Sequence, residues 1–147
     1  MPTQLKLLIA VSFFLLLAAC NSGKRVNQDF SGTWEGTLSQ DAGGLAPAYD
    51  YIMEIVQLDN EISGTATIQI PAGGYAGQLQ FSGTVSGNTL SFQDTKVITS
   101  TIPAENSFWC LKRGQLKLSG DTLSGLWSAD NCSPGTITLS RQSGVRL

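Results

Sequence analysis

Few residues in this chain could do chemistry, and its three cysteines are the most reactive of them. Histidine, the side chain that most often serves as a general base or a metal ligand, is absent from the sequence. Glycosidases need two carboxylates at a set separation, whereas the acidic residues here fall on different predicted strands and faces. The acidic residues considered are Glu35, Glu54, Asp94 and Glu105. We therefore expect a non-enzymatic protein with no catalytic residues, no cofactor and no metal site.

Cys20 ends a segment that has the pattern of a secretory signal. Residues 1–6 are short, polar and positively charged, and residues 7–19 are almost entirely apolar. That apolar run is shorter than the roughly 20 residues that a transmembrane helix needs. It closes with Leu-Ala-Ala directly before Cys20, which resembles the lipobox of bacterial lipoproteins.

The resemblance implies that residues 1–19 are removed and that the Cys20 thiol receives a diacylglycerol, with acylation of the new amine. An ordinary signal with a chance cysteine is the alternative. Two or more acyl chains hold a protein stably on a membrane, so the expected location is the bacterial cell envelope. In the enterobacterial sorting pattern, an aspartate directly after the lipidated cysteine favours retention in the inner membrane. This sequence has Asn21 at that position, which favours the outer membrane where the source has one.

The mature chain divides into a polar tether at 20–29 and a single domain at 30–147. The formal net charge of the whole sequence is −2, and no basic patch is present. This composition argues against nucleic acid as a partner.

After the tether, apolar and polar residues alternate with a period of two, and helical periodicity is absent. The pattern predicts eight strands, at 31–39, 49–58, 61–70, 79–86, 89–101, 108–119, 122–128 and 136–141. Three connections are two-residue turns of types that tolerate positive φ: Asp59-Asn60, Gly87-Asn88 and Gly120-Asp121. When the hairpins are centred on these turns, apolar and glycine residues lie together on one face of each hairpin. Met53, for example, faces Ala66.

The other four connections are longer and rich in Gly, Pro and Ala; they are 40–48, 71–78, 102–107 and 129–135. Because long and tight connections alternate, an up-and-down meander would place three tight turns and both termini at one end and four loops at the other. Closure of eight antiparallel strands hides both edges of the sheet. We therefore predict an all-β fold, an eight-stranded antiparallel up-and-down β-barrel.

The predicted exported domain contains two cysteines, Cys110 and Cys132. An even number of cysteines in an exported domain predicts a disulfide. The hairpin register places Cys110 opposite Asn131, so a single bulge would bring its sulfur to that of Cys132. A zinc site would need about four ligands, and the sequence contains no group of residues with the spacing of zinc ligands.

The first predicted strand opens with a Gly-Thr-Trp triplet that ends at Trp34 and resembles the Gly-x-Trp start of calycin barrels, the lipocalin and avidin group. The segments 61–66 (EISGTA) and 122–127 (TLSGLW) are similar to outgoing strands of avidins. The resemblance covers most of residues 30–141. It implies that Trp34 closes the barrel floor and that Arg141 stacks on it. The polar set that binds biotin in avidins has no match here, so biotin is not implied.

Five aromatic residues fall in the loop-side half of the predicted barrel: Tyr49, Tyr51, Tyr75, Trp109 and Trp127. Aromatic rings with a polar edge suit a ligand cavity. In the alternative they fill the barrel, because eight strands leave room either for packed side chains or for one small ligand.

Asp94 and Lys96 interrupt the alternation of the fifth predicted strand. We interpret this as a β-bulge after which Val97 turns inward. A buried ion pair is the alternative.

The sequence thus predicts a membrane-anchored, non-enzymatic lipoprotein that binds a small, partly apolar ligand at the open end of its barrel. The alternative is a protein-interaction module that uses its mouth loops, as an inhibitor of an exported hydrolase or as an envelope assembly component. An open cavity would favour the first function and a solid core the second. By strand count, the floor should face the membrane and the mouth should face away from it.

Overall fold

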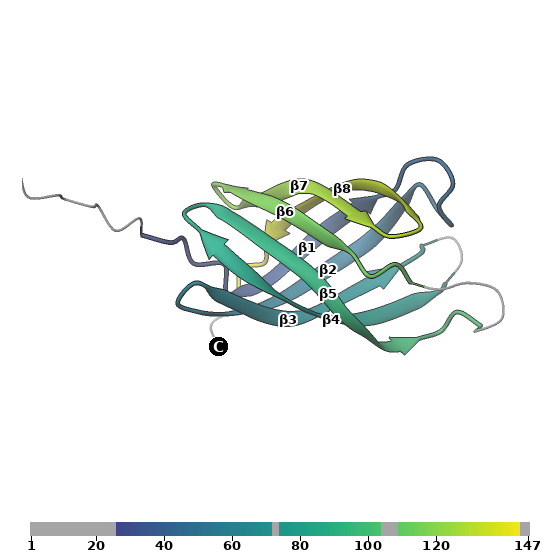
Figure 1. Cartoon of the computed structure of the whole chain (residues 1–147), viewed down its shortest axis with the longest axis horizontal. Helices are drawn as coiled ribbons and strands as arrows, with labels where there is room; N and C mark the ends of the chain where they lie inside the picture. The colour runs from purple at the N-terminus through teal and green to yellow at the C-terminus, as the bar shows by residue number, and fades with distance from the viewer. Residues whose placement is uncertain (1–25, 72–73, 104–108, 145–147) are drawn as a thin grey trace, which may run out of the picture.

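A computed structural model describes residues 26–71, 74–103 and 109–144; the predicted signal, Cys20 and most of the tether lie outside them. The strands are β1 (Gly32–Ser39), β2 (Ala48–Leu58), β3 (Glu61–Gln69), β4 (Ala76–Ser86), β5 (Thr89–Ser100), β6 (Arg113–Ser119), β7 (Thr122–Ala129) and β8 (Cys132–Arg141). Sequence neighbours pair antiparallel and β8 pairs with β1, so the eight strands form a closed barrel (Figure 1). The predicted fold is confirmed. No helix within the described ranges is long and apolar enough to span a membrane.

The alternation of residue types separates the inside of the barrel from the outside. Along β2, Tyr49, Tyr51, Met53 and Ile55 are buried, and the residues between them are more exposed. The predicted register is also confirmed. The cross-strand partners are Met53 with Ala66, Ile55 with Gly64, Val85 with Leu90, Gly83 with Phe92, Leu116 with Gly125 and Leu118 with Leu123. A slip of one residue would turn each of these side chains to the other face.

The three predicted tight turns lie at one end of the barrel, together with the ends of the described chain (Figure 1). Asp59, Gly87 and Gly120 have φ angles of 56°, 61° and 60°, the left-handed conformation that such turns require. The opposite end carries three longer connections, at 40–47, 70–75 and 101–112.

The predicted long loop at 129–135 is wrong, because β8 already begins at Cys132 and a tight turn at 130–131 precedes it. Asn131 takes the left-handed φ of 60°, as Asp59 does in the first turn. Pro134 and Gly135 suggested a loop. They are accommodated because the β7–β8 register shifts beside them, and a bulge is one of the few strand positions that tolerate proline.

Two inward-facing glycines show how the strands bend to close this barrel. A Cβ atom at Gly64 would overlap the carbonyl oxygen of Glu54, and one at Gly83 would overlap that of Ser91. The backbone of the neighbouring strand therefore occupies the position that a Cβ atom would take. Glycine, which has no Cβ atom, allows this close approach where strands bend sharply.

The floor of the barrel is built around Trp34, which is fully buried and donates a hydrogen bond from Nε1 to the Phe30 carbonyl at 2.9 Å. Arg141 is its cross-strand partner on β8, and the guanidinium carbon lies 4.3 Å from the centroid of the Trp34 ring. The same guanidinium donates to the carbonyl oxygens of Ser31 at 2.7 Å and Asp29 at 2.6 Å. One arginine thus links the last strand, the first strand and the segment that precedes it.

We predict that Trp34→Ala lowers the free energy of unfolding by about 3–5 kcal/mol, the range for truncating a buried large aromatic. Arg141→Ala should cost less, and a double-mutant cycle measured by urea denaturation should give a clear interaction energy. Arg113→Ala is the control, because its ion pair with Asp130 is exposed and should contribute at most about 1 kcal/mol. Additive effects of Trp34→Ala and Arg141→Ala would contradict the coupling.

Candidate ligand-binding site

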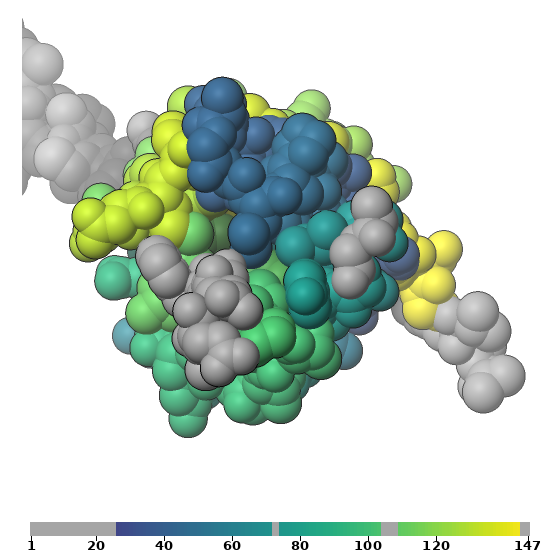
Figure 2. All heavy atoms as spheres, turned by 90° about the vertical axis from the view of Figure 1, so that its right-hand side faces the viewer, coloured from purple at the N-terminus to yellow at the C-terminus, as the bar shows by residue number. Residues whose placement is uncertain are grey.

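The long-loop end of the barrel contains a cavity of about 360 Å³. Its wall combines strand ends with the connections that follow them. The lining residues are Leu38, Gln40, Gly43, Gly44, Leu45, Tyr49, Ile68, Trp109, Cys110, Lys112, Trp127, Asn131, Cys132 and Ser133. Figure 2 looks onto this end, where the blue 40–47 loop lies beside the yellow-green β7–β8 turn. Ligand pockets span roughly 300–1,000 Å³, so this cavity has the size for one small molecule.

Three of the five predicted aromatic residues meet in this cavity: Tyr49, Trp109 and Trp127. Tyr51 is buried one inward position further from the mouth than Tyr49 and does not line the cavity. Tyr75 lies just before β4, outside the cavity, and is 41% exposed. The alternation along β2 correctly predicted that Tyr49 and Tyr51 both face the interior of the barrel. It could not predict how far each ring lies from the mouth.

The polar edges of both tryptophans are held by the protein itself. Trp109 donates from Nε1 to Ser100 Oγ at 2.9 Å, and Trp127 donates from Nε1 to the Ser39 carbonyl at 2.8 Å. Trp109 also packs against Gly77, where a Cβ atom would overlap the indole. The two indoles are therefore fixed before any ligand arrives.

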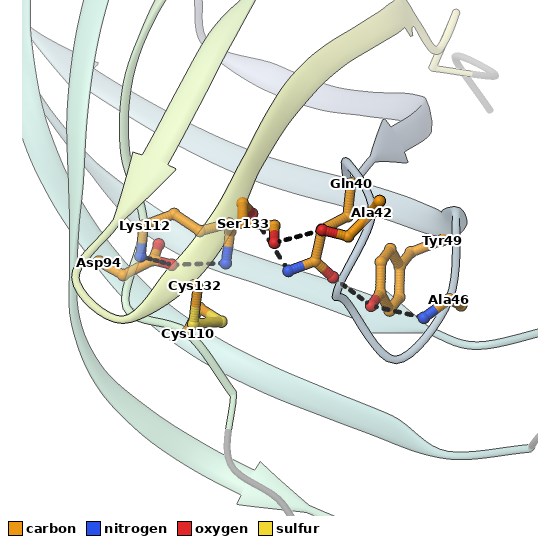
Figure 3. The surroundings of a disulfide bond; sticks show 9 residues. All are labelled: Gln40, Ala42, Ala46, Tyr49, Asp94, Cys110, Lys112, Cys132 and Ser133. Carbon is orange, nitrogen blue, oxygen red and sulfur yellow. Dashed lines mark hydrogen bonds and ion pairs between the residues drawn. A yellow bond between two sulfur atoms is a disulfide. The ribbon is translucent and has the colours of Figure 1, made fainter.

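A hydrogen-bond network joins the 40–47 loop to the beginning of β8 (Figure 3). The Tyr49 hydroxyl donates to Gln40 Oε1, and Gln40 Nε2 donates to the Ser133 carbonyl at 3.2 Å. Ser133 Oγ donates in turn to the Ala42 carbonyl at 2.8 Å, and the Ala46 amide donates to the Tyr49 hydroxyl at 3.1 Å. These bonds make one rim of the cavity from two segments that are far apart in the sequence.

The predicted disulfide between Cys110 and Cys132 is confirmed, with the sulfurs 1.96 Å apart (Figure 3). Its geometry differs from the predicted hairpin bulge. Because β6 begins at Arg113, Cys110 lies in the connection before that strand, and the bond ties this connection to the first residue of β8. For a sequence separation of 22 residues, such a crosslink stabilises by about 3 kcal/mol in the chain-entropy model.

A buried ion pair lies beneath the cavity, between Asp94 on β5 and Lys112 in the connection before β6. Each residue is 2% exposed. Lys112 Nζ lies 2.6 Å from Asp94 Oδ2, and the Lys112 amide donates to the same oxygen at 3.0 Å. The Asp94 amide donates to the Lys112 carbonyl at 2.7 Å, so side chains and backbone join the two positions.

The ion pair corrects the interpretation of the fifth strand. The β4–β5 register does shift, but Asp94 faces inward and Val97 is 39% exposed. Lys96 is exposed, and Lys112 supplies the cation instead. The signal was present in the sequence, because Asp94 continues the inward series through Leu90 and Phe92. A charge is stable inside the barrel only because its counter-ion lies at hydrogen-bond distance.

Tyr51 completes a buried polar cluster with Asp94 and Lys112. The Lys112 ammonium lies 5.5 Å from the centroid of the Tyr51 ring. Among the described residues, the Tyr51 hydroxyl and Asp94 Oδ1 have no hydrogen-bond partner. Burial raises the pKa of the Tyr51 phenol well above its ordinary value, and the charge of Asp94 raises it further. The phenol therefore stays protonated and can donate a hydrogen bond.

The other acidic residues considered in the sequence do not join this cluster. Glu35 and Glu54 are exposed on the outer face, and Glu105 lies outside the described residues. The described part of the chain contains no group of three or more acidic or cysteine side chains that could hold a metal ion. The sequence matches no protein-family model and has no significant match among curated proteins.

We predict that Lys112→Met destabilises the protein by about 3–5 kcal/mol in urea denaturation, because it leaves the Asp94 charge buried without a partner. The double variant Asp94→Val, Lys112→Met should recover most of that loss, since no charge is then buried. Lys96→Met is the control, because Lys96 lies on the same strand as Asp94 and is exposed. A Lys112→Met variant as stable as Lys96→Met would argue against a charged pair in the interior.

Proposed function

We propose that the barrel binds one small, partly apolar ligand in the cavity at its long-loop end. The observation that carries the proposal is a preformed cavity of about 360 Å³ walled by Tyr49, Trp109 and Trp127. The polar edges of the two indoles are already hydrogen-bonded to protein, so the rings offer apolar faces. Aromatic faces with a few convergent polar groups are the usual lining of a small-molecule site.

The binding test adds the same bulky side chain inside and outside the cavity. Ile68 lines the cavity, whereas Val56 on β2 is exposed on the outer face. We predict that Ile68→Trp weakens binding of N-phenyl-1-naphthylamine, a neutral apolar fluorophore, by about tenfold, because the indole fills space that the probe needs. Val56→Trp should bind the probe like the parent. Circular dichroism checks that both variants fold, and equal affinities for the two would contradict a ligand site in the cavity.

We further propose that Cys20 carries the lipid anchor and that the mouth of the barrel faces away from the membrane. The segment before β1 supports this orientation, because it is attached to the tight-turn end. The Gln28 amide donates to the Gly87 carbonyl at 2.9 Å, and the Gly87 amide donates to Asn27 Oδ1 at 2.9 Å. The chain therefore enters the barrel at the end opposite the cavity, which leaves the mouth free for a ligand.

Cys20→Ala should abolish incorporation of a fatty-acid analogue during metabolic labelling, because alanine has no thiol to alkylate. Asn21→Ala is the matched control and should still be labelled, since the thiol and the Leu-Ala-Ala sequence before it are intact. Label that persists on Cys20→Ala protein would overturn the lipoprotein assignment.

A protein-interaction role for the mouth is the second candidate function. It is favoured by large apolar side chains exposed in the three long connections: Leu45, Tyr75 and Leu111. Exposed apolar groups that cluster on one surface commonly mark contact sites for other proteins. Ile68→Trp separates the two functions, because it fills the cavity and leaves Tyr75 and Leu111, which lie outside the cavity, unchanged.

A further inference from the structure

The buried polar cluster of Tyr51, Asp94 and Lys112 gives the cavity a polar inner end. Lys112 lines the cavity directly. Tyr51 lies one inward position below Tyr49, and Asp94 lies behind Lys112 through their 2.6 Å ion pair. The remainder of the wall includes Trp109 and Trp127. Lys112 is therefore the member of the cluster that a ligand in this cavity contacts, because neither Tyr51 nor Asp94 lines the wall.

The hydrogen-bonding capacity of the cluster exceeds what the described residues use. Lys112 Nζ has three donors, of which one is directed to Asp94 Oδ2. Within the described ranges, Asp94 Oδ1 and the Tyr51 hydroxyl are buried without a partner. A buried polar group without a partner costs free energy. Neither of these two atoms belongs to the cavity wall, so the group that a ligand can reach is Lys112, which has donors to spare.

The charges of the cluster cancel, and this restricts the ligand further. A carboxylate that approached Lys112 would be repelled by the nearby carboxylate of Asp94. An ammonium group that approached Asp94 would be repelled by Lys112. Either ion would also lose its hydration without a counter-charge, because the two charges of the protein already neutralise each other at 2.6 Å.

We propose that this cluster recognises the polar end of the ligand through Lys112 and selects a neutral head group that accepts a hydrogen bond, such as a hydroxyl or a primary amide. The inference rests on the proposed ligand-binding function. The ligand class is a short neutral amphiphile, with its head at Lys112 and its apolar part between the two indoles.

The test uses four ligands with the same chain: 1-octanol, octanamide, octanoate and octylammonium. Each competes with N-phenyl-1-naphthylamine for the mature chain carrying Cys20→Ala, which avoids detergent. Octanol and octanamide should bind roughly tenfold more tightly than the two ions, because an added charge faces a like charge in the cluster. Octane, which has no head group, should bind more weakly than octanol.

Two variants assign the preference to the cluster. The double variant Asp94→Val, Lys112→Met should reduce the affinity for octanol by about fivefold, through loss of the hydrogen bond from Lys112, and should leave octane unchanged. Lys96→Met is the matched control, because Lys96 is exposed and does not line the cavity. Asp94→Asn leaves the Lys112 charge unpaired, so octanoate should gain affinity relative to octanol.

The outcomes separate this inference from the proposed function. Equal binding of all four head groups, or equal binding of octane and octanol, would overturn the head-group inference and leave the cavity as an apolar site. The latter result would indicate that water already satisfies the cluster. If neither the probe nor any octyl compound binds, the ligand-binding function itself fails. If the double variant does not fold, the octanoate shift in Asp94→Asn decides the question.

Discussion

The pairing of β1 with β8 is the constraint on which the other features of this protein depend. It converts a meander with two open edges into a barrel with an interior. Trp34 and Arg141 are partners across this last seam, and the same arginine holds the carbonyl oxygens of Asp29 and Ser31. The seam is non-local, because it joins the first strand of the domain to the last. Only after it forms do the inward residues of all eight strands face one another.

The two ends of the barrel use that interior differently. At the tight-turn end, Trp34 and its neighbours fill the space. At the other end, residues of the long connections form part of the cavity wall, while the Cys110–Cys132 disulfide and the network through Gln40 fix its rim. A rim held in this way loses little conformational entropy when a ligand binds, which favours affinity. The division of roles thus follows from where the chain makes short turns and where it makes long ones.

The ion pair between Asp94 and Lys112 is better explained by the proposed recognition of a ligand than by stability. A buried ion pair is weak evidence for stability, because apolar residues of similar volume often serve as well. Through Lys112 the pair reaches the cavity wall, which gives it a part in the proposed function. The pair brings donors and acceptors into an apolar interior without adding net charge. The same arrangement supplies both the polarity and the charge neutrality that a neutral amphiphile requires.

The sequence by itself determined the strands, three tight turns, their register, the disulfide partners and the all-β barrel. These features rest on local rules: alternation with a period of two, and turn residues such as Asp59 and Gly120 that accept positive φ. The tertiary structure decided the rest. It turned Asp130 and Asn131 into a fourth tight turn, because a bulge accommodates Pro134. It also paired Asp94 with Lys112 and separated Tyr49, Trp109 and Trp127 from the exposed Tyr75. Alternation shows which residues face inward, but depth and partnership arise only when distant strands close around the same space.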